Sequence, residues 1–236
     1  MFWNNVKIAL RNLKKNKGFA AINITGLAIG LTIYVFGSLL VDYERTHDAF
    51  FDKYDRIFSI GATAAPDLNV GFEKFNAVQS AVGPILEAEL TDIEAIARTI
   101  EIEFLVEMGA DSFYQGIRFT DPALLEIFDF EYIQGDASAL EDASSLVISE
   151  SAAIKYFGTT DALGKVVTLD NEFDFSVSAV IRDVPRNSHF NSQLVVDSKL
   201  DVLAPMQALT RTRELDIAGN WTNLSLGNMT SVSYTH

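Results

Sequence analysis

The longest uninterrupted apolar segment of the chain lies near its N-terminus. Residues 18–41 contain no Asp, Glu, Lys, Arg or His, and a stretch of mixed apolar and basic positions precedes them. As a helix, the apolar segment would be about 36 Å long, which is enough to cross a hydrocarbon core of roughly 30 Å. The pattern therefore predicts a transmembrane helix over residues 18–41.

A cleaved signal peptide is the alternative interpretation, because it also begins with basic residues and an apolar run. Its hydrophobic region is normally only about 7–15 residues long and ends at a small-x-small cleavage site. The run in this chain is longer and continues into Asp42-Tyr-Glu-Arg45. These differences favour a retained membrane anchor.

Residues 2–15 have the period of an amphipathic helix. At 100° per residue, the apolar side chains fall on one side, at Phe2, Val6, Ala9, Leu10 and Leu13. The candidate membrane-surface residues of the first 17 positions are Trp3, Lys7, Arg11, Lys14, Lys15 and Lys17. Each cation near anionic lipid adds about 1 kcal/mol, so we predict an interfacial helix over residues 1–17 rather than an ordinary solvated basic start.

The charges on either side of the apolar segment predict its orientation. Five cations and no acid precede it, whereas acidic and basic residues are mixed directly after it. The positive-inside rule places the basic side in the cytoplasm. We therefore expect a protein of the bacterial inner membrane, with its N-terminus cytoplasmic and residues 42–236 periplasmic.

Two glycines inside the apolar segment are candidate helix-packing residues. Gly26 and Gly30 are four residues apart and match the small-xxx-small pattern that lets two helix backbones approach closely. Glycine is common in membrane helices, so a chance match is the alternative.

Beyond residue 41 the pattern is mixed, which predicts an α+β domain. We expect the membrane helix to continue as a stalk from Val41 towards Tyr54. Further strands are expected over 56–62, 93–108, 113–120, 165–169 and 173–182, and helices over 78–90, 121–128 and 149–158. Asp121 is a candidate cap of the second of these helices, and Ser149 or Ser151 of the third, which Gly158 ends.

The pattern weakens after Leu200, and no closing element is evident before His236. We therefore expect the domain over residues 42–236 to be truncated at its C-terminus.

Charge and composition exclude some classes of function for this domain. The whole chain has a net charge of −14, but residues 42–236 contain 13 basic and 32 acidic side chains, a net charge of −19. Such a surface repels nucleic acid and favours solubility, so nucleic acid is excluded as a partner and residues 45–236 should be soluble alone. The chain has no cysteine, which excludes disulfides and thiolate metal sites.

No motif indicates catalysis. The run from Gly158 to Lys165 looks like a phosphate-binding loop, but it has five residues instead of four between its glycines, and Val166 follows the lysine. The three histidines lack paired ligand spacing, and although His47 and Asp48 could share a helical face with Glu44, surface solvation is the simpler interpretation. We therefore expect no enzyme activity, no metal and no cofactor.

Several stretches in order resemble the FtsX-like ABC transporter permease family, specifically members with a MacB-like periplasmic core domain. The stretches around the apolar segment are Ala9-Leu-Arg-Asn-Leu-Lys-Lys-Asn-Lys-Gly-Phe19, residues 22–30 and Tyr43-Glu-Arg-Thr-His-Asp-Ala-Phe-Phe-Asp-Lys-Tyr-Asp-Arg-Ile57. The later ones are residues 128–135, Val147-Ile-Ser-Glu-Ser-Ala-Ala-Ile-Lys-Tyr-Phe-Gly158, residues 163–165 and Asp183-Val-Pro-Arg-Asn-Ser-His189. The resemblance implies a split porter-like lobe and a smaller lobe, the latter incomplete in this chain.

The resemblance also implies a function and partners. Permeases of this family transmit ATP-driven motion to an exterior domain in export or in lipoprotein and peptide handling. It implies a separate P-loop ATPase, a permease homodimer or heterodimer, contact with membrane lipid and a periplasmic partner protein. The chain lacks the family's later membrane helices, so the alternative is a single-pass anchored binding or sensor module.

Overall fold

The computed structural model describes residues 2–63, 74–75, 78–108, 111–191, 199–212 and 230–235. The chain divides into two compact units, Met1–His47 and Asp48–His236. Each unit is described by itself below.

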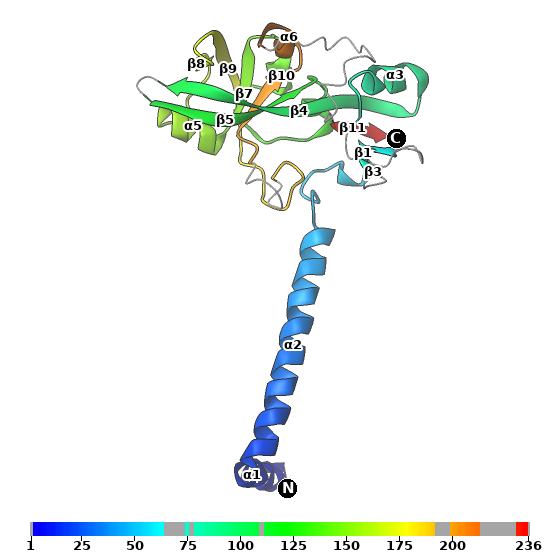
Figure 1. Cartoon of the computed structure of the whole chain (residues 1–236), viewed down its shortest axis with the longest axis vertical. Helices are drawn as coiled ribbons and strands as arrows, with labels where there is room; N and C mark the ends of the chain where they lie inside the picture. Colours follow the sequence, from blue (N-terminus) through cyan, green and yellow to red (C-terminus); the bar gives the residue numbers. More distant parts are fainter. Residues whose placement is uncertain are drawn as a thin grey trace. The chain divides into compact units, whose positions relative to one another are not determined.

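The first unit consists of two helices. Helix α1 covers Phe2–Lys15 and helix α2 covers Lys17–Arg45, with Asn16 between them. In Figure 1, α1 is seen nearly end-on at the start of α2, which runs lengthwise. Both predicted helices are present, but the predicted stalk is short. Helix α2 ends at Arg45, and turns lead from there to the short 3-10 helix η1 (Tyr54–Arg56).

The second unit is built on a nine-stranded sheet with a two-stranded sheet beside it, as far as the described residues show. The strands are β1 (Ile57–Ile60), β2 (Ala62–Thr63), β3 (Lys74–Phe75), β4 (Ile93–Met108), β5 (Asp111–Thr120), β6 (Tyr132–Gln134), β7 (Ser145–Ser149), β8 (Val166–Leu169), β9 (Phe173–Ile181), β10 (Val202–Pro205) and β11 (Thr230–Thr235). The large sheet has the order β1-β11-β4-β5-β10-β7-β9-β6, and β2 pairs with β3.

The large sheet curls back on itself. Strand β8 pairs with β9 and also with β4, where Val106 lies opposite Leu169. Most neighbours are antiparallel, but β10 is parallel to β5 and β7 is parallel to β9. The long hairpin of β4 and β5 crosses the unit in Figure 1, with α3 (Val82–Glu89) beside β4. Strands and helices are therefore mixed, and the predicted α+β class is confirmed.

Hydrophobic side chains cover both faces of the central strands. Strand β7 is buried at all five positions, so Leu146 and Ile148 join one core while Val147 joins the other. The first core packs under α5 (Glu150–Phe157) and α6 (Ala208–Thr212). The second core contains α4 (Leu124–Ile127), the 3-10 helix η2 (Ala137–Leu140) and a cluster of phenylalanines.

Local sequence signals fix the ends of α5. The Ser149 hydroxyl accepts a hydrogen bond from the backbone N–H of Ala152, and Gly158 ends the helix in the left-handed conformation with φ of 71°. A glycine is favoured there because a side chain in this conformation meets the carbonyl that follows. Of the two candidate caps, Ser149 is the one that caps the helix.

Several elements differ from the expectations. Strands β6, β7, β10 and β11 were not predicted, and β11 lies between β1 and β4 in the large sheet. Asp121 does not cap α4, whose N-cap is Ala123 without a side-chain hydrogen bond. The predicted strands over 93–108 and 113–120 are present as β4 and β5 and pair with each other, and residues 109–110 between them lie outside the described residues.

Candidate functional site

Helix α2 has the length and composition of a membrane span. It is the one helix among the described residues that is long and apolar enough to cross a bilayer, with a mean hydropathy of 2.1 over its best window. The Thr32 hydroxyl is compatible with lipid, since its Oγ1 donates a hydrogen bond of 2.8 Å to the carbonyl oxygen of Ala28. A hydroxyl bonded within its own helix avoids the cost of an unsatisfied polar group in hydrocarbon.

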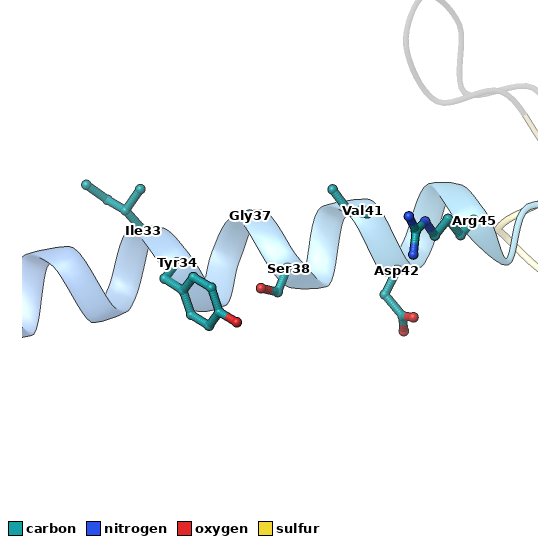
Figure 2. A pocket seen from close by; sticks show the side chains of 7 residues that line it. All are labelled: Ile33, Tyr34, Gly37, Ser38, Val41, Asp42 and Arg45. Atoms are coloured by element: carbon teal, nitrogen blue, oxygen red, sulfur yellow. The ribbon is translucent and has the colours of Figure 1, made fainter.

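A shallow groove of about 540 Å³ runs along the C-terminal half of α2. In Figure 2, Ile33 and Val41 project on one side of Gly37, and Tyr34, Ser38 and Asp42 on the other. The groove exists because Gly37 has no side chain, and a Cβ added there would meet nothing within 4 Å. A neighbouring helix can approach such a surface closely.

The predicted packing glycines lie on the same side of the helix as Gly37. At 100° per residue, Gly26, Gly30 and Gly37 fall within about 40° of one another. A Cβ added to Gly26 or Gly30 would also meet nothing within 4 Å. The sequence interpretation missed Gly37 because it lies seven residues after Gly30 rather than four.

The predicted membrane-surface residues lie on α1 and at the start of α2. Their side chains are exposed, at Trp3, Lys7, Arg11, Lys14, Lys15 and Lys17. Trp3 is 74% exposed, and Lys14 and Lys15 occupy the last turn of α1, where cations interact favourably with the helix dipole. The side chains of Phe2, Val6, Ala9 and Leu10 lie outside the described residues, so their predicted stripe stays a prediction.

Asp48 and His189 lie far apart in the sequence but are in contact in the structure. Asp48 does not share a helical face with Glu44 and His47, since α2 ends at Arg45 and Asp48 has a positive φ of 57°. Instead, its Oδ2 lies 3.0 Å from Nδ1 of His189. Burial raises the pKa of Asp48, but hydrogen bonds from His189 and Ser188 and the charge of His189 outweigh it and lower the pKa. The ionised carboxylate therefore stabilises the fold above the ordinary aspartate pKa, and this stabilisation is lost as the pH falls through the lowered value.

Asp121 forms a partly buried ion pair instead of a helix cap. Its carboxylate accepts hydrogen bonds of 2.8 Å from both Nε and Nη2 of Arg98, and one from the Arg98 backbone N–H. The hydrogen bonding of the Arg98 guanidinium to the Asp121 carboxylate raises the pKa of Arg98. A cavity of about 220 Å³ lies beside the pair, with Glu87 and Gly83 of α3 in its wall. The guanidinium is already paired, so the arrangement fixes α3 and the turn before α4 against β4.

The glycine-flanked run before β8 is turn structure, not a phosphate-binding loop. Gly158 and Gly164 have positive φ values of 71° and 73°. The Lys165 Nζ lies 4.9 Å from the centre of the Phe157 ring, a cation–π contact rather than a position in a cradle of backbone N–H groups. Across the described residues, no group of three or more histidine or acidic side chains is placed to hold a metal ion.

Comparisons with known proteins show which sequences and folds this chain resembles. The sequence profile of the MacB-like periplasmic core domain matches residues 20–232. No curated protein matches the sequence.

Three solved structures share the fold. A domain of a protein described as a permease from Porphyromonas gingivalis is 24% identical, with a TM-score of 0.60 over 79% of this chain and 77% of that one. The periplasmic region of MacB from Actinobacillus actinomycetemcomitans is 14% identical, with a TM-score of 0.52 over 78% and 76% of the two chains. The extracellular domain of the noncanonic ABC-type transporter YknZ from Gram-positive bacteria is 11% identical, with a TM-score of 0.51 over 77% and 82%.

The profile match covers most of the chain and includes both the end of the apolar helix and the curled sheet. The chain therefore belongs to the family of MacB-like periplasmic core domains of ABC transporter permeases.

Proposed function

We propose that this chain belongs to the membrane subunit of an ABC transporter, and that it couples ATP hydrolysis by a partner ATPase to movement of its exterior domain. The observation that carries the proposal is that a MacB-like core domain follows a helix long enough to span a bilayer, in one chain. The movement would serve export or the handling of lipoproteins or peptides.

The division of labour rests on what the chain contains. Its glycine-flanked run departs from the phosphate-binding loop, so ATP would be hydrolysed by a separate P-loop ATPase. A second permease copy or a related permease would pack against the glycine side of α2, and a periplasmic partner protein would meet the exterior domain.

The proposal includes a boundary for each part of the chain. Residues 1–17 would lie in the cytoplasmic headgroup layer, residues 18–41 would span the membrane, and residues 42–236 would form the periplasmic domain. The C-terminal end of α2 would face the periplasm, where the polar sequence begins with Asp42 and Arg45.

The orientation predicts a result in spheroplasts. Protease added from outside should digest the acidic domain, because it lies in the periplasm, and should spare a tag placed before residue 1. Lysed spheroplasts are the control, since there the tag should be lost as well. An acidic domain protected in intact spheroplasts would reverse the orientation and contradict the proposed function.

The proposed function predicts how glycine substitutions affect activity. Gly26→Leu with Gly30→Leu should weaken helix packing by about 1 kcal/mol, because the two side chains fill the surface that a neighbouring helix approaches. In vesicles holding the permease and its ATPase, ATP-driven movement of the domain should fall more than ATP hydrolysis does. Ala21→Leu with Ala28→Leu is the matched control, because both alanines lie on the opposite side of α2.

Two outcomes would contradict these assignments. Hydrolysis of ATP by the permease without its partner would overturn the division of labour. Full movement in the glycine double variant would remove the packing role of Gly26 and Gly30.

A further inference from the structure

Thr46, the residue that follows α2, caps the C-terminal end of the helix. The backbone N–H and the Oγ1 of Thr46 both donate hydrogen bonds to the carbonyl oxygen of Asp42, at 3.0 and 2.9 Å. These bonds satisfy a carbonyl that the end of a helix otherwise leaves without an intrahelical partner. Only His47 separates this capped end from Asp48, the first residue of the second unit.

Asp48 is bonded to one short segment 139 or more residues later in the chain. Its backbone N–H donates to the carbonyl oxygen of Asn187 at 3.0 Å. Its carboxylate accepts from the backbone N–H of His189 at 3.1 Å and lies 3.0 Å from the Nδ1 of the same residue. Aspartate is one of the few residue types that tolerate the left-handed conformation of this position, with φ of 57°. Backbone and side chain of one residue are thus both used to hold the segment.

Aromatic packing reinforces the same connection. Phe51, three residues after Asp48, is 3% exposed, and its ring centre lies 4.9 Å from that of Phe128. The ring of His189 lies 5.0 Å from Phe128 and 4.0 Å from Phe190. His189 therefore takes part both in the polar contact with Asp48 and in the phenylalanine cluster of the second core.

The segment around His189 is itself fastened to the central sheet. Asn191 donates from Nδ2 to the carbonyl oxygens of Val184 and Pro185, both at 2.9 Å, and its Oδ1 accepts from the backbone N–H of Leu200. This links the end of β9 to the start of β10. A displacement of Asp48 would therefore act on two inner strands of the sheet rather than on a loose surface loop.

We propose that Asp48 and His189 form the joint through which movement of α2 is passed to the central sheet. The proposal rests on the function proposed above, in which ATP-driven motion crosses the membrane. Both residues act as positioning residues. The pair is partly exposed, at 22% for the Asp48 side chain and 35% for that of His189, so it is reachable for chemical modification.

The test uses the full-length permease with its partner ATPase in lipid vesicles. A fluorescent amino acid replaces Tyr114, which is 71% exposed, and an acceptor dye is attached to the lipid. Energy transfer then reports movement of the exterior domain relative to the bilayer when ATP is added. His189→Phe keeps an aromatic ring beside Phe128 but removes Nδ1, and Asp48→Ala removes the carboxylate. Each should reduce the ATP-dependent change in transfer at least threefold while ATP hydrolysis stays within twofold.

Two further variants separate a joint from a general effect on folding. Asp52→Asn, at an exposed acid four residues after Asp48, should leave the change intact. Asp48→Cys with His189→Cys should lose the movement, regain it when a short reducible reagent links the two thiols, and lose it again on reduction. A residue that only stabilised the fold would not give this reversal.

Three other outcomes would each overturn the proposed joint. If the unsubstituted protein moves and the Asp48 and His189 variants move equally, the joint is wrong while the proposed function stands. The joint is also overturned if reduction of the linked cysteine variant leaves its movement unchanged. If the unsubstituted protein shows no ATP-dependent change, the proposed function fails and the joint with it.

Discussion

Gly135→Ala should destabilise the second unit by about 2–5 kcal/mol, because two costs add at this position. Gly135 has a φ of 77°, a left-handed conformation that side chains rarely adopt. A Cβ there would also overlap the carbonyl oxygen of Ser178 and would lie 2.7 Å from the Cβ of Ala179, both on β9. Neither neighbour has a flexible side chain end that could move aside, so β6 and β9 would have to separate.

Gly158→Ala is the matched control, since it isolates the cost of conformation. Its φ of 71° is nearly the same, but a Cβ there meets nothing within 4 Å. It should cost only about 1–2 kcal/mol. Urea unfolding of residues 45–236, followed by circular dichroism, measures both values. Equal losses of stability at the two glycines would show that Gly135 does not lie close to β9.

Phe128→Ala should cost about 3–5 kcal/mol, the usual range for removing a fully buried phenylalanine. Phe128 is 0% exposed, and its ring centre lies 4.7 Å from that of Phe190 and 4.9 Å from that of Phe51. The cavity left by the ring would loosen the cluster that joins the start of the unit to the segment around His189. We expect lower thermal stability, measured by calorimetry on residues 45–236.

Phe58→Ala provides the comparison for an exposed ring of the same type. Phe58 is 52% exposed on strand β1, so its loss should change the unfolding free energy by less than about 0.5 kcal/mol. A small effect at Phe128, or a large one at Phe58, would mean that the second core is not packed as described here.

Elements with strong local signals were predictable from the sequence. The hairpin of β8 and β9 turns at residues 170–172, where Asp170 and Asn171 have φ values of 51° and 60°, a left-handed conformation that aspartate and asparagine tolerate. The serine and glycine at the ends of α5 and the alternation along β4 and β5 are signals of the same local kind. In each case the residues that determine the element lie within it or next to it.

The missed strands depend on partners far away in the chain. Strands β7 and β10 are short and buried on both faces, so they lack the polar and apolar alternation of a half-exposed strand. Strand β11 pairs with β1, more than 170 residues earlier, and its polar residues gave no hydrophobic pattern. Pairing between distant segments is not encoded in local periodicity.

The same distinction applies to the candidate site. The membrane helix and the basic face of α1 follow from periodicity and charge within a few turns of helix. The pairing of Asp48 with His189 does not, because 141 positions separate the two residues and no local pattern joins the two stretches in which they lie. Asp121 was misread because a helix cap is a local use of an aspartate, whereas its partner Arg98 lies on another strand.

Transmission of motion by this chain can be measured as ATP-dependent energy transfer from position 114 to labelled lipid in the unsubstituted permease–ATPase complex. We expect a change in transfer when ATP is added, reversed when the nucleotide is removed. The change should be absent with an ATPase variant that cannot bind ATP. A complex that hydrolyses ATP at its full rate while the transfer stays constant would contradict the proposal that this chain carries motion from the membrane to its exterior domain.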